Sequence, residues 1–213
     1  MAKKKHRFIA VAGVLGSGKT TAVKLIADSL GYEVLEENVA GNQFLPLFYK
    51  NPKRWALASQ LFYLQERFSQ IEKVERSIRK NGLVLDGPVQ SDYEMYTKAL
   101  HRLGHINDSE LALYEKYFRK LEATFPVPDL ILHLQVPVPT ILKRVKMRGR
   151  SFEKDINTSY LSLLSKLQTT WLKAHRASPV LNINTEKLDL AQDPEHKEKF
   201  ISTVMRHIEK LPA

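Results

Sequence analysis

Gly13-Val14-Leu15-Gly16-Ser17-Gly18-Lys19-Thr20 fits the pattern G-x-x-x-x-G-K-[ST], and this stretch decides the fold. It follows the apolar run 8–12, which predicts a buried strand, and it opens a helical pattern over residues 20–30 that stops at Gly31. A glycine-rich turn between a strand and a helix gathers backbone N–H groups around phosphate oxygens, and the helix N-terminus adds partial positive charge. The stretch therefore predicts a phosphate-binding loop for a nucleoside triphosphate.

The residues of this loop have separate predicted tasks. Lys19 can reach the β- and γ-phosphates, and the Thr20 hydroxyl can bind Mg²⁺. An ordinary glycine-rich turn is the alternative, and the strand–loop–helix setting argues against it. The predicted triphosphate-binding residues of the loop are Gly13, Gly16, Ser17, Gly18, Lys19, Thr20 and Thr21.

Working outward from the loop, apolar strand-like segments alternate with helical patterns along the chain. The alternation predicts a single α/β domain over 1–213, with a five-stranded, mostly parallel sheet flanked by helices, of the P-loop NTPase or kinase type. The other predicted strands are 32–36, 83–86, 129–134 and 180–183, and the other predicted helices are about 53–80, 89–103, 108–123, 138–147, 157–176 and 195–210.

The composition of the chain narrows the classes of site and ligand. None of the 213 residues is a cysteine, which excludes disulfides, cysteine-ligated zinc and thiol nucleophiles. The formal charge of +10 favours polyanionic ligands, which include phosphorylated small molecules, nucleic acid and anionic membrane surfaces. No apolar run approaches the ~18–20 residues of a membrane span, so we expect a cytoplasmic protein with a basic tail over residues 1–6.

Carboxylates follow two of the predicted strands and should meet near the phosphate loop, because parallel strands end at one edge of a sheet. Asp86 either completes a Mg²⁺ site with Thr20 or merely begins the turn Asp86-Gly87-Pro88. Glu36 and Glu37 follow the second strand. One of them could accept the proton of an attacking hydroxyl, or both could be solvated acids.

The long predicted helix combines an apolar stripe, expected to face the core, with the polar row Gln60, Tyr63 and Arg67. On spacing alone the polar row is more typical of a solvated face than of a binding cleft. If it lines a cleft, Gln60 suits the edge of a base, and Asp92 or Gln90 could join it. The candidates for a stacking surface beside a base are Phe44, Trp55 and Tyr96. The apolar stripe comprises Leu57, Leu61, Leu64, Phe68, Ile71, Val74 and Ile78.

The loop alone does not identify the phosphoryl acceptor. The chain has no guanine-reading Asn-Lys-x-Asp segment, and its length fits a small kinase. The ordered set of motifs resembles the deoxyribonucleoside kinase family, the deoxyadenosine, deoxyguanosine and deoxycytidine type, over nearly the whole chain. The blocks that carry the resemblance are Gly13 to Thr20, Glu36-Glu37-Asn38-Val39, Tyr49-Lys50-Asn51-Pro52-Lys53-Arg54-Trp55 with Gln60 and Arg67, and Lys143-Arg144-Val145-Lys146-Met147-Arg148-Gly149-Arg150-Ser151-Phe152-Glu153.

The resemblance implies ATP-dependent transfer of a phosphoryl group to the 5′-hydroxyl of a deoxyribonucleoside. Glu37 would be the catalytic base, Gln60 would pair with the nucleoside base, and Arg67 would work with Asp92. The other implied substrate-binding residues are Tyr49, Tyr96 and Glu153, and the arginines Arg144, Arg148 and Arg150 of a lid over residues 144–154 would grip the donor phosphates. The implied partners are Mg²⁺ at Thr20 and Asp86, nucleosides and nucleotides, and a second copy in a homodimer, with neither a membrane nor nucleic acid.

Two positions depart from the family pattern. Gly87 stands where the family usually has an arginine near the acceptor 5′-oxygen, and Asn38 stands where it has proline. Three alternatives follow. In the first, another cation replaces the missing arginine, and Arg144 is the first candidate for this catalytic residue. In the second, the acceptor differs and is, for example, a nucleoside monophosphate. In the third, the protein binds nucleotide with little or no turnover and serves as an interaction subunit. The positive charge also leaves a nucleic-acid-binding ATPase as a rival.

Overall fold

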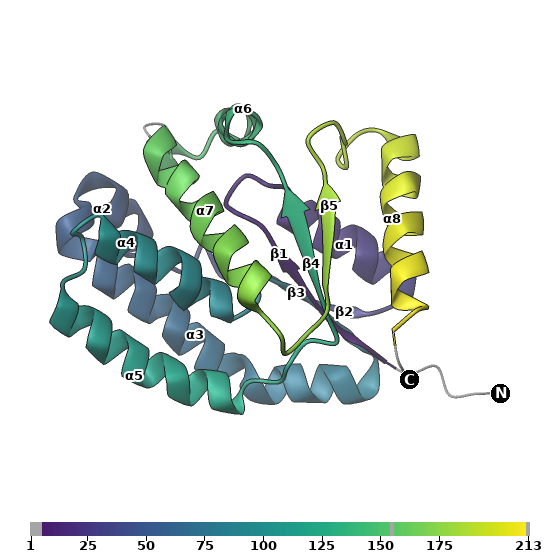
Figure 1. The fold of residues 1–213 in the computed structure, drawn as a ribbon, viewed down its shortest axis with the longest axis horizontal. Helices are drawn as coiled ribbons and strands as arrows, with labels where there is room; N and C mark the ends of the chain where they lie inside the picture. The colour runs from purple at the N-terminus through teal and green to yellow at the C-terminus, as the bar shows by residue number, and fades with distance from the viewer. Residues whose placement is uncertain (1–5, 154–155, 212–213) are drawn as a thin grey trace.

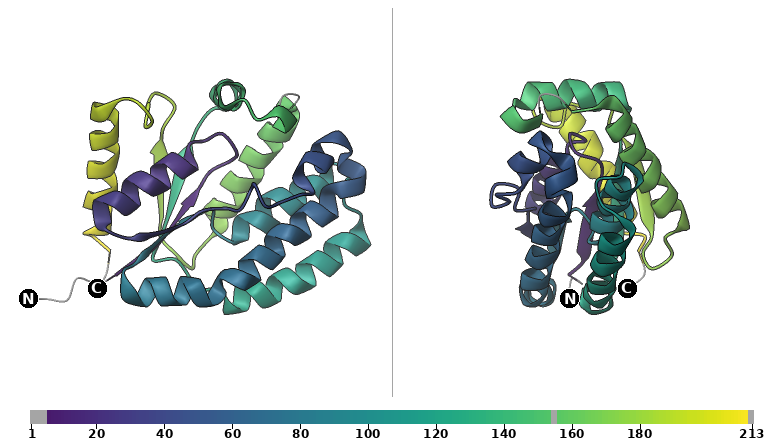
Figure 2. Two further views of the ribbon diagram at one scale, coloured as in Figure 1. Left: turned by 180° about the vertical axis from the view of Figure 1, so that it is seen from behind. Right: turned by 90° about the vertical axis from the view of Figure 1, so that its left-hand side faces the viewer.

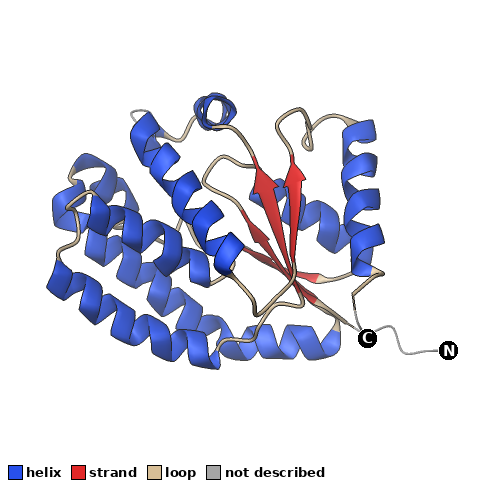
Figure 3. Cartoon of the chain, viewed as in Figure 1, coloured by secondary structure: helices blue, strands red, loops and turns tan. Residues whose placement is uncertain are grey.

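The computed structural model describes residues 6–153 and 156–211, and its centre is a parallel sheet of five strands in the order β2-β3-β1-β4-β5 (Figures 1 and 3). Every neighbouring pair runs parallel, which confirms the predicted fold class and all five predicted strands. The strands are β1 Phe8–Ala12, β2 Glu33–Leu35, β3 Leu83–Asp86, β4 Leu130–Gln135 and β5 Val180–Asn184.

Helices cover both faces of this sheet. Helices α1 and α8 pack on one face, and α3, α5 and α7 pack on the other (Figures 1 and 2). Helix α6 lies across the end of the molecule at which β4 and β5 finish (Figure 1). The helices are α1 Lys19–Leu30, α2 Leu45–Lys50, α3 Pro52–Lys80, η1 Asp92–Thr97, α4 Lys98–Arg102, α5 Asp108–Thr124, α6 Val138–Arg148, η2 Ser151–Glu153, α7 Thr158–Ala174 and α8 Pro194–Ile208.

Central strand β1 is apolar throughout because both of its faces are covered. Ile9 and Val11 pack with α1 and α8, whereas Phe8 and Ala10 pack with α3 and α5. Every residue of β1 is at most 1% exposed. A parallel strand buried on both sides reads as a continuous hydrophobic run, and it places the residues that follow it at the carboxyl edge of the sheet.

The structure corrects three details of the predicted helices. The segment predicted as one helix over 89–103 contains the π-helix η1, and the short helix α2 was not predicted. In α3 the expected core stripe is only partly buried, because Leu61 and Phe68 are 37% and 39% exposed. Gln60 and Arg67 are instead buried, at 6% and 4% exposed, so their interpretation as a solvated face is wrong.

Two further sequence-based expectations concern the ends of the chain and membranes. The predicted tail over 1–6 falls outside the described residues except for His6. Within residues 6–153 and 156–211, no helix has the length and the apolar character that a membrane crossing requires.

Stability should depend on the buried side of α5. Leu121 is 1% exposed, and Leu121→Ala is expected to lower the free energy of unfolding by about 2–5 kcal/mol because it leaves a cavity. Met147, which is 76% exposed on α6, is the matched control, and Met147→Ala should change the same quantity by less than about 0.5 kcal/mol. Urea denaturation of both variants measures the difference. Equal losses would contradict the described packing.

Candidate functional site

The phosphate loop has the backbone shape that its glycines predict. Gly16 and Gly18 have φ values of +76° and +96°, a left-handed region that residues with a Cβ rarely adopt. Gly13 is needed for a different reason, since a Cβ there would lie 2.3 Å from Oγ of Ser17. The loop then leads directly into the N-terminus of α1 at Lys19.

Thr20 and Asp86 meet beside this loop, as predicted for a metal site. The Thr20 hydroxyl donates a hydrogen bond of 2.8 Å to Oδ2 of Asp86. Asp86 is 4% exposed, and neither its Oδ1 nor Oγ of Ser17 has a partner among the described residues. Two buried oxygens without partners, next to a hydroxyl and a carboxylate, suit a small cation with oxygen ligands. The residues present therefore fit Mg²⁺.

A cavity of about 70 Å³ opens next to the loop and gathers most of the predicted acceptor residues. The predicted residues that line it are Glu37, Tyr49, Gln60, Tyr63, Asp92, Tyr96, Arg150 and Glu153. Of the candidates for stacking, Tyr96 lines the cavity, whereas Phe44 and Trp55 stack on each other with ring centroids 5.9 Å apart.

Sequence reasoning missed part of this wall. Tyr160 comes from α7, and Leu15, Val39, Leu45 and Phe48 complete the lining. Tyr160 had no usable signal, because a lone tyrosine in an amphipathic helix pattern is more often a core residue. Burial raises the pKa of Tyr49, Tyr63, Tyr96 and Tyr160, so their hydroxyls stay protonated and can donate hydrogen bonds.

The two glutamates after β2 are in different environments. Glu36 is exposed and pairs with Lys24 at 3.0 Å. Glu37 lines the cavity, and burial raises its pKa to about 7, although the positive charges of Lys19 and Arg67 oppose the rise. A carboxylate with a pKa near neutrality, in reach of a bound hydroxyl, is suited to accept its proton.

Arg67 and Asp92 form a buried ion pair behind the cavity. Nε of Arg67 lies 3.0 Å from Oδ2 of Asp92, and Nη2 donates to the Gly87 carbonyl oxygen at 3.1 Å. Both side chains of the pair are 4% exposed. Burial disfavours the charge on Arg67, but the charge and hydrogen bond of Asp92, together with the charges of Glu37 and Asp86, outweigh it. The pKa of Arg67 is therefore raised and the guanidinium remains charged.

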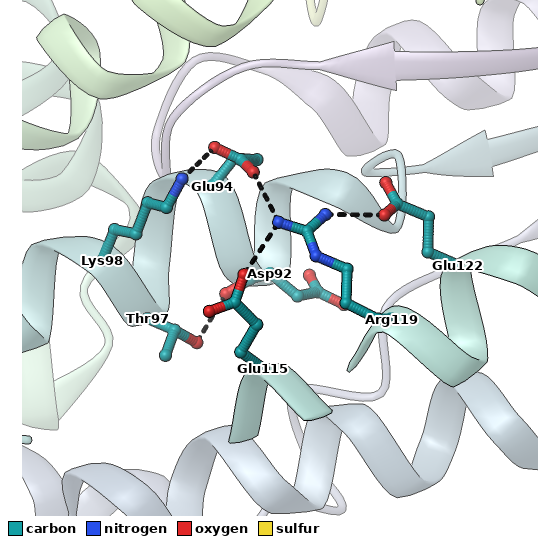
Figure 4. Close-up of polar contacts among 7 residues, drawn as sticks. All are labelled: Asp92, Glu94, Thr97, Lys98, Glu115, Arg119 and Glu122. Atoms are coloured by element: carbon teal, nitrogen blue, oxygen red, sulfur yellow. Dashed lines mark hydrogen bonds and ion pairs between the residues drawn. The ribbon is translucent and has the colours of Figure 1, made fainter. Parts of the chain in front are cut away.

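Asp92 belongs to η1, whose outer surface carries a second set of charges (Figure 4). Glu94 accepts from Lys98 at 2.6 Å, and Arg119 of α5 pairs with Glu115 at 3.0 Å and Glu122 at 2.7 Å (Figure 4). Arg119 also lies 3.9 Å from Glu94, so it links η1 to α5. π-Helical turns are often found at functional sites, and here the turn presents Asp92 and Tyr96 to one side and Glu94 to the other.

The predicted lid arginines have two separate sets of partners. Arg148 and Arg150 both pair with Glu153, which is 4% exposed, and the Arg150–Glu153 distance is 3.4 Å. Phe152 packs on Tyr49 with ring centroids 5.5 Å apart, which holds this segment over the cavity. Lys154, the last residue of the predicted lid, lies outside the described residues.

Arg144 is not placed with Glu37. Its Nη1 donates to the carbonyl oxygen of Ser17 at 3.1 Å, and its Nη2 donates to those of Thr185 at 2.7 Å and Leu188 at 3.3 Å. These three bonds join the phosphate loop to the segment between β5 and α8. Arg144 is not among the residues that line the acceptor cavity, and its role as a substitute cation stays a prediction.

Comparison with known proteins gives a consistent result. A family model described as "Deoxynucleoside kinase" matches residues 9–209. The chain is 31% identical over 205 residues to a deoxyguanosine kinase of Bacillus subtilis (strain 168), covering 96% of this chain and 97% of that protein. It is 33% identical to a deoxyadenosine kinase of Dictyostelium discoideum, covering 91% and 77%. A solved structure of deoxyadenosine kinase from M. mycoides shares its fold, with a TM-score of 0.82, 24% identity and coverage of 94% and 98%.

The close approach at Gly13 gives a test of the phosphate loop. Gly13→Ala is expected to weaken binding of ATP by roughly tenfold or more, because the new methyl group must displace Ser17 and distort the loop. Gly104→Ala is the control: its φ of +70° strains an alanine, but nothing lies within 4 Å of a Cβ there and the residue is outside the loop, so the affinity for ATP should not change. Titration with a fluorescent ATP analogue measures both affinities. Unchanged affinity in Gly13→Ala would show that triphosphates bind elsewhere.

Proposed function

The chain belongs to the deoxynucleoside kinase family and phosphorylates deoxynucleosides with ATP, and from this premise we propose which of its residues carry out the transfer. The observation that carries the proposal is the position of Glu37, an acid with a pKa near 7, in the cavity beside the phosphate loop. The lone charged amine of that loop, Lys19, acts on the same carboxylate.

In the proposed reaction Glu37 accepts the proton of the acceptor 5′-hydroxyl. The oxygen then forms a bond to the γ-phosphorus while the bond from that phosphorus to the β–γ bridging oxygen breaks, and ADP leaves with the electron pair. Lys19 and the backbone N–H groups of the loop bind the phosphates and hold them in line with the acceptor. When bound, Mg²⁺ held by Thr20 and Asp86 would neutralise phosphate charge.

We assign recognition of the acceptor to the other side chains of the cavity. Gln60 offers both a donor and an acceptor to the edge of a base, and Tyr96 offers an aromatic face. Tyr49 and Glu153, which line the same cavity, bind the sugar hydroxyl in this proposal. Glu153 already binds Arg148 and Arg150, so these arginines must exchange the carboxylate for donor phosphates when ATP is present.

We also propose a homodimer through an apolar surface on α3 and α5. Leu61 and Phe68 of α3 and Leu113 and Tyr117 of α5 are each 37–49% exposed. A shallow hollow lined by Leu61, Phe68 and Tyr117 joins the two helices. Large exposed apolar side chains that gather on one surface are typical of an interface between subunits.

The role of Glu37 is tested with a matched pair of glutamates. Glu37→Gln should lower kcat by roughly 10²–10⁴-fold, because the variant cannot accept a proton, whereas Glu36→Gln should leave kcat nearly unchanged. For the unmodified enzyme, kcat/KM should fall as the pH drops below about 7, since protonation removes the base.

Initial rates with ATP, Mg²⁺ and a panel of deoxyadenosine, deoxyguanosine, deoxycytidine and a nucleoside monophosphate measure these effects and identify the acceptor. Equal activities of Glu37→Gln and the unmodified enzyme would remove Glu37 from the role of base.

The proposed dimer surface is tested by introducing a charged side chain into it. Phe68→Glu should convert a dimer to a monomer, because a carboxylate in an apolar interface loses its water without gaining a partner. Leu103→Glu is the control, at a residue that is 40% exposed on another part of the surface. Light scattering after size-exclusion chromatography gives the mass of each. A monomeric unmodified protein would overturn the proposal.

A further inference from the structure

The turn after β3 leaves room for a guanidinium. Gly87 has a φ of +82°, and a Cβ at this position would lie 3.3 Å from Nη2 of Arg67. Nη2 already donates to the Gly87 carbonyl oxygen at 3.1 Å. The glycine at the end of β3 thus lets a cation from α3 approach the edge of the sheet next to Asp86, which contacts Thr20 of the phosphate loop.

Arg67 has one nitrogen that is not used. Its Nε is bound by Asp92 and its Nη2 by Gly87, but Nη1 has no partner among residues 6–153 and 156–211 although it is buried. A buried charged N–H group without an acceptor is costly. Because two of its nitrogens are held, the guanidinium is fixed in place behind the cavity, which its partner Asp92 lines, and the third nitrogen keeps its N–H groups available for an oxygen that reaches it.

The remaining arginines near the site are engaged elsewhere. Arg144 is bound by three carbonyl oxygens, and Arg148 and Arg150 are held by Glu153. Arg67 and Lys19, in contrast, both act electrostatically on Glu37. Arg150 lines the cavity but is paired with Glu153, and Lys19 belongs to the triphosphate site. Among the described residues, Arg67 is therefore the remaining candidate cation on the acceptor side, next to Asp92 in the cavity wall.

We propose that Arg67 is a catalytic residue, and that its Nη1 donates a hydrogen bond to the acceptor 5′-oxygen or to the phosphoryl group as it moves onto that oxygen. This inference rests on the proposed function. The proton of the hydroxyl still passes to Glu37, and Arg67 keeps its own proton throughout while it stabilises negative charge on the reacting oxygens. The role goes beyond the base-binding task that the sequence resemblance implies for Arg67 with Asp92.

The two roles of Arg67 predict changes in different kinetic constants. A catalytic role predicts a lower kcat, whereas a role in binding the base predicts a higher KM for the nucleoside. With saturating ATP and the best acceptor of the panel, Arg67→Lys should lower kcat roughly 10²-fold, since lysine cannot hold Asp92 and Gly87 and still reach the reacting oxygens. Gln60→Ala, which alters only a contact to the base, should mainly raise KM for the nucleoside.

Two further variants guard against loss of folding. Gly87→Ala keeps Arg67 but crowds its Nη2, so it too should lower kcat more than it raises KM. Arg119→Lys is the matched control in the charged cluster outside the cavity, and it should leave kcat unchanged (Figure 4). Melting temperatures of all variants identify any that fail to fold. If Arg67→Lys is one of them, the kcat and KM of Gly87→Ala decide whether Arg67 has the proposed role.

The outcomes separate the two proposals. An active unmodified enzyme whose Arg67→Lys and Gly87→Ala variants keep kcat and only raise KM would overturn the role of Arg67 and leave the proposed function intact. An unmodified enzyme that phosphorylates no member of the panel would overturn the proposed function, and the inference about Arg67 with it.

Discussion

The buried ion pair between Arg67 and Asp92 sets the geometry on the acceptor side of the site. Taking two charges out of water costs several kcal/mol for each ion, and only close pairing compensates for that cost. Helix α3 and π-helix η1 must therefore pack in the register that joins Nε to Oδ2 at 3.0 Å. That same register brings Gln60 and Tyr96 to one cavity and sets the guanidinium against the turn at Gly87.

The predictable parts of the structure are those in which the local sequence determines both the backbone conformation and the burial of the side chains. The run 8–12 is apolar at every position and is buried on both faces, and the glycines of the phosphate loop require the positive φ values that they have. The cavity was predictable in a different way. Glu37, Tyr49 and Glu153 lie far apart in the chain, and only the ordered resemblance to a family indicated that they would meet.

Sequence-based interpretation fails or stays open where a pattern gives the position of a side chain around a helix or after a strand but does not say what packs against it. Periodicity in α3 places Gln60 and Arg67 to one side of the apolar stripe, but it does not say whether water or η1 covers that side, and η1 does. Likewise, adjacent glutamates after β2 look equivalent in sequence, although one meets Lys24 in solvent and the other enters the cavity. The carbonyl partners of Arg144 come from the phosphate loop and the loop after β5, and side-chain patterns do not encode such backbone contacts.

Glu153 has a consequence for a protein with a formal charge of +10. By holding both Arg148 and Arg150 on one buried carboxylate, it offsets one of their two positive charges and fixes the position of both guanidinium groups. Two guanidinium groups are therefore already oriented beside the cavity before any ligand binds, and an anion that engages them has to take them from a carboxylate rather than from water.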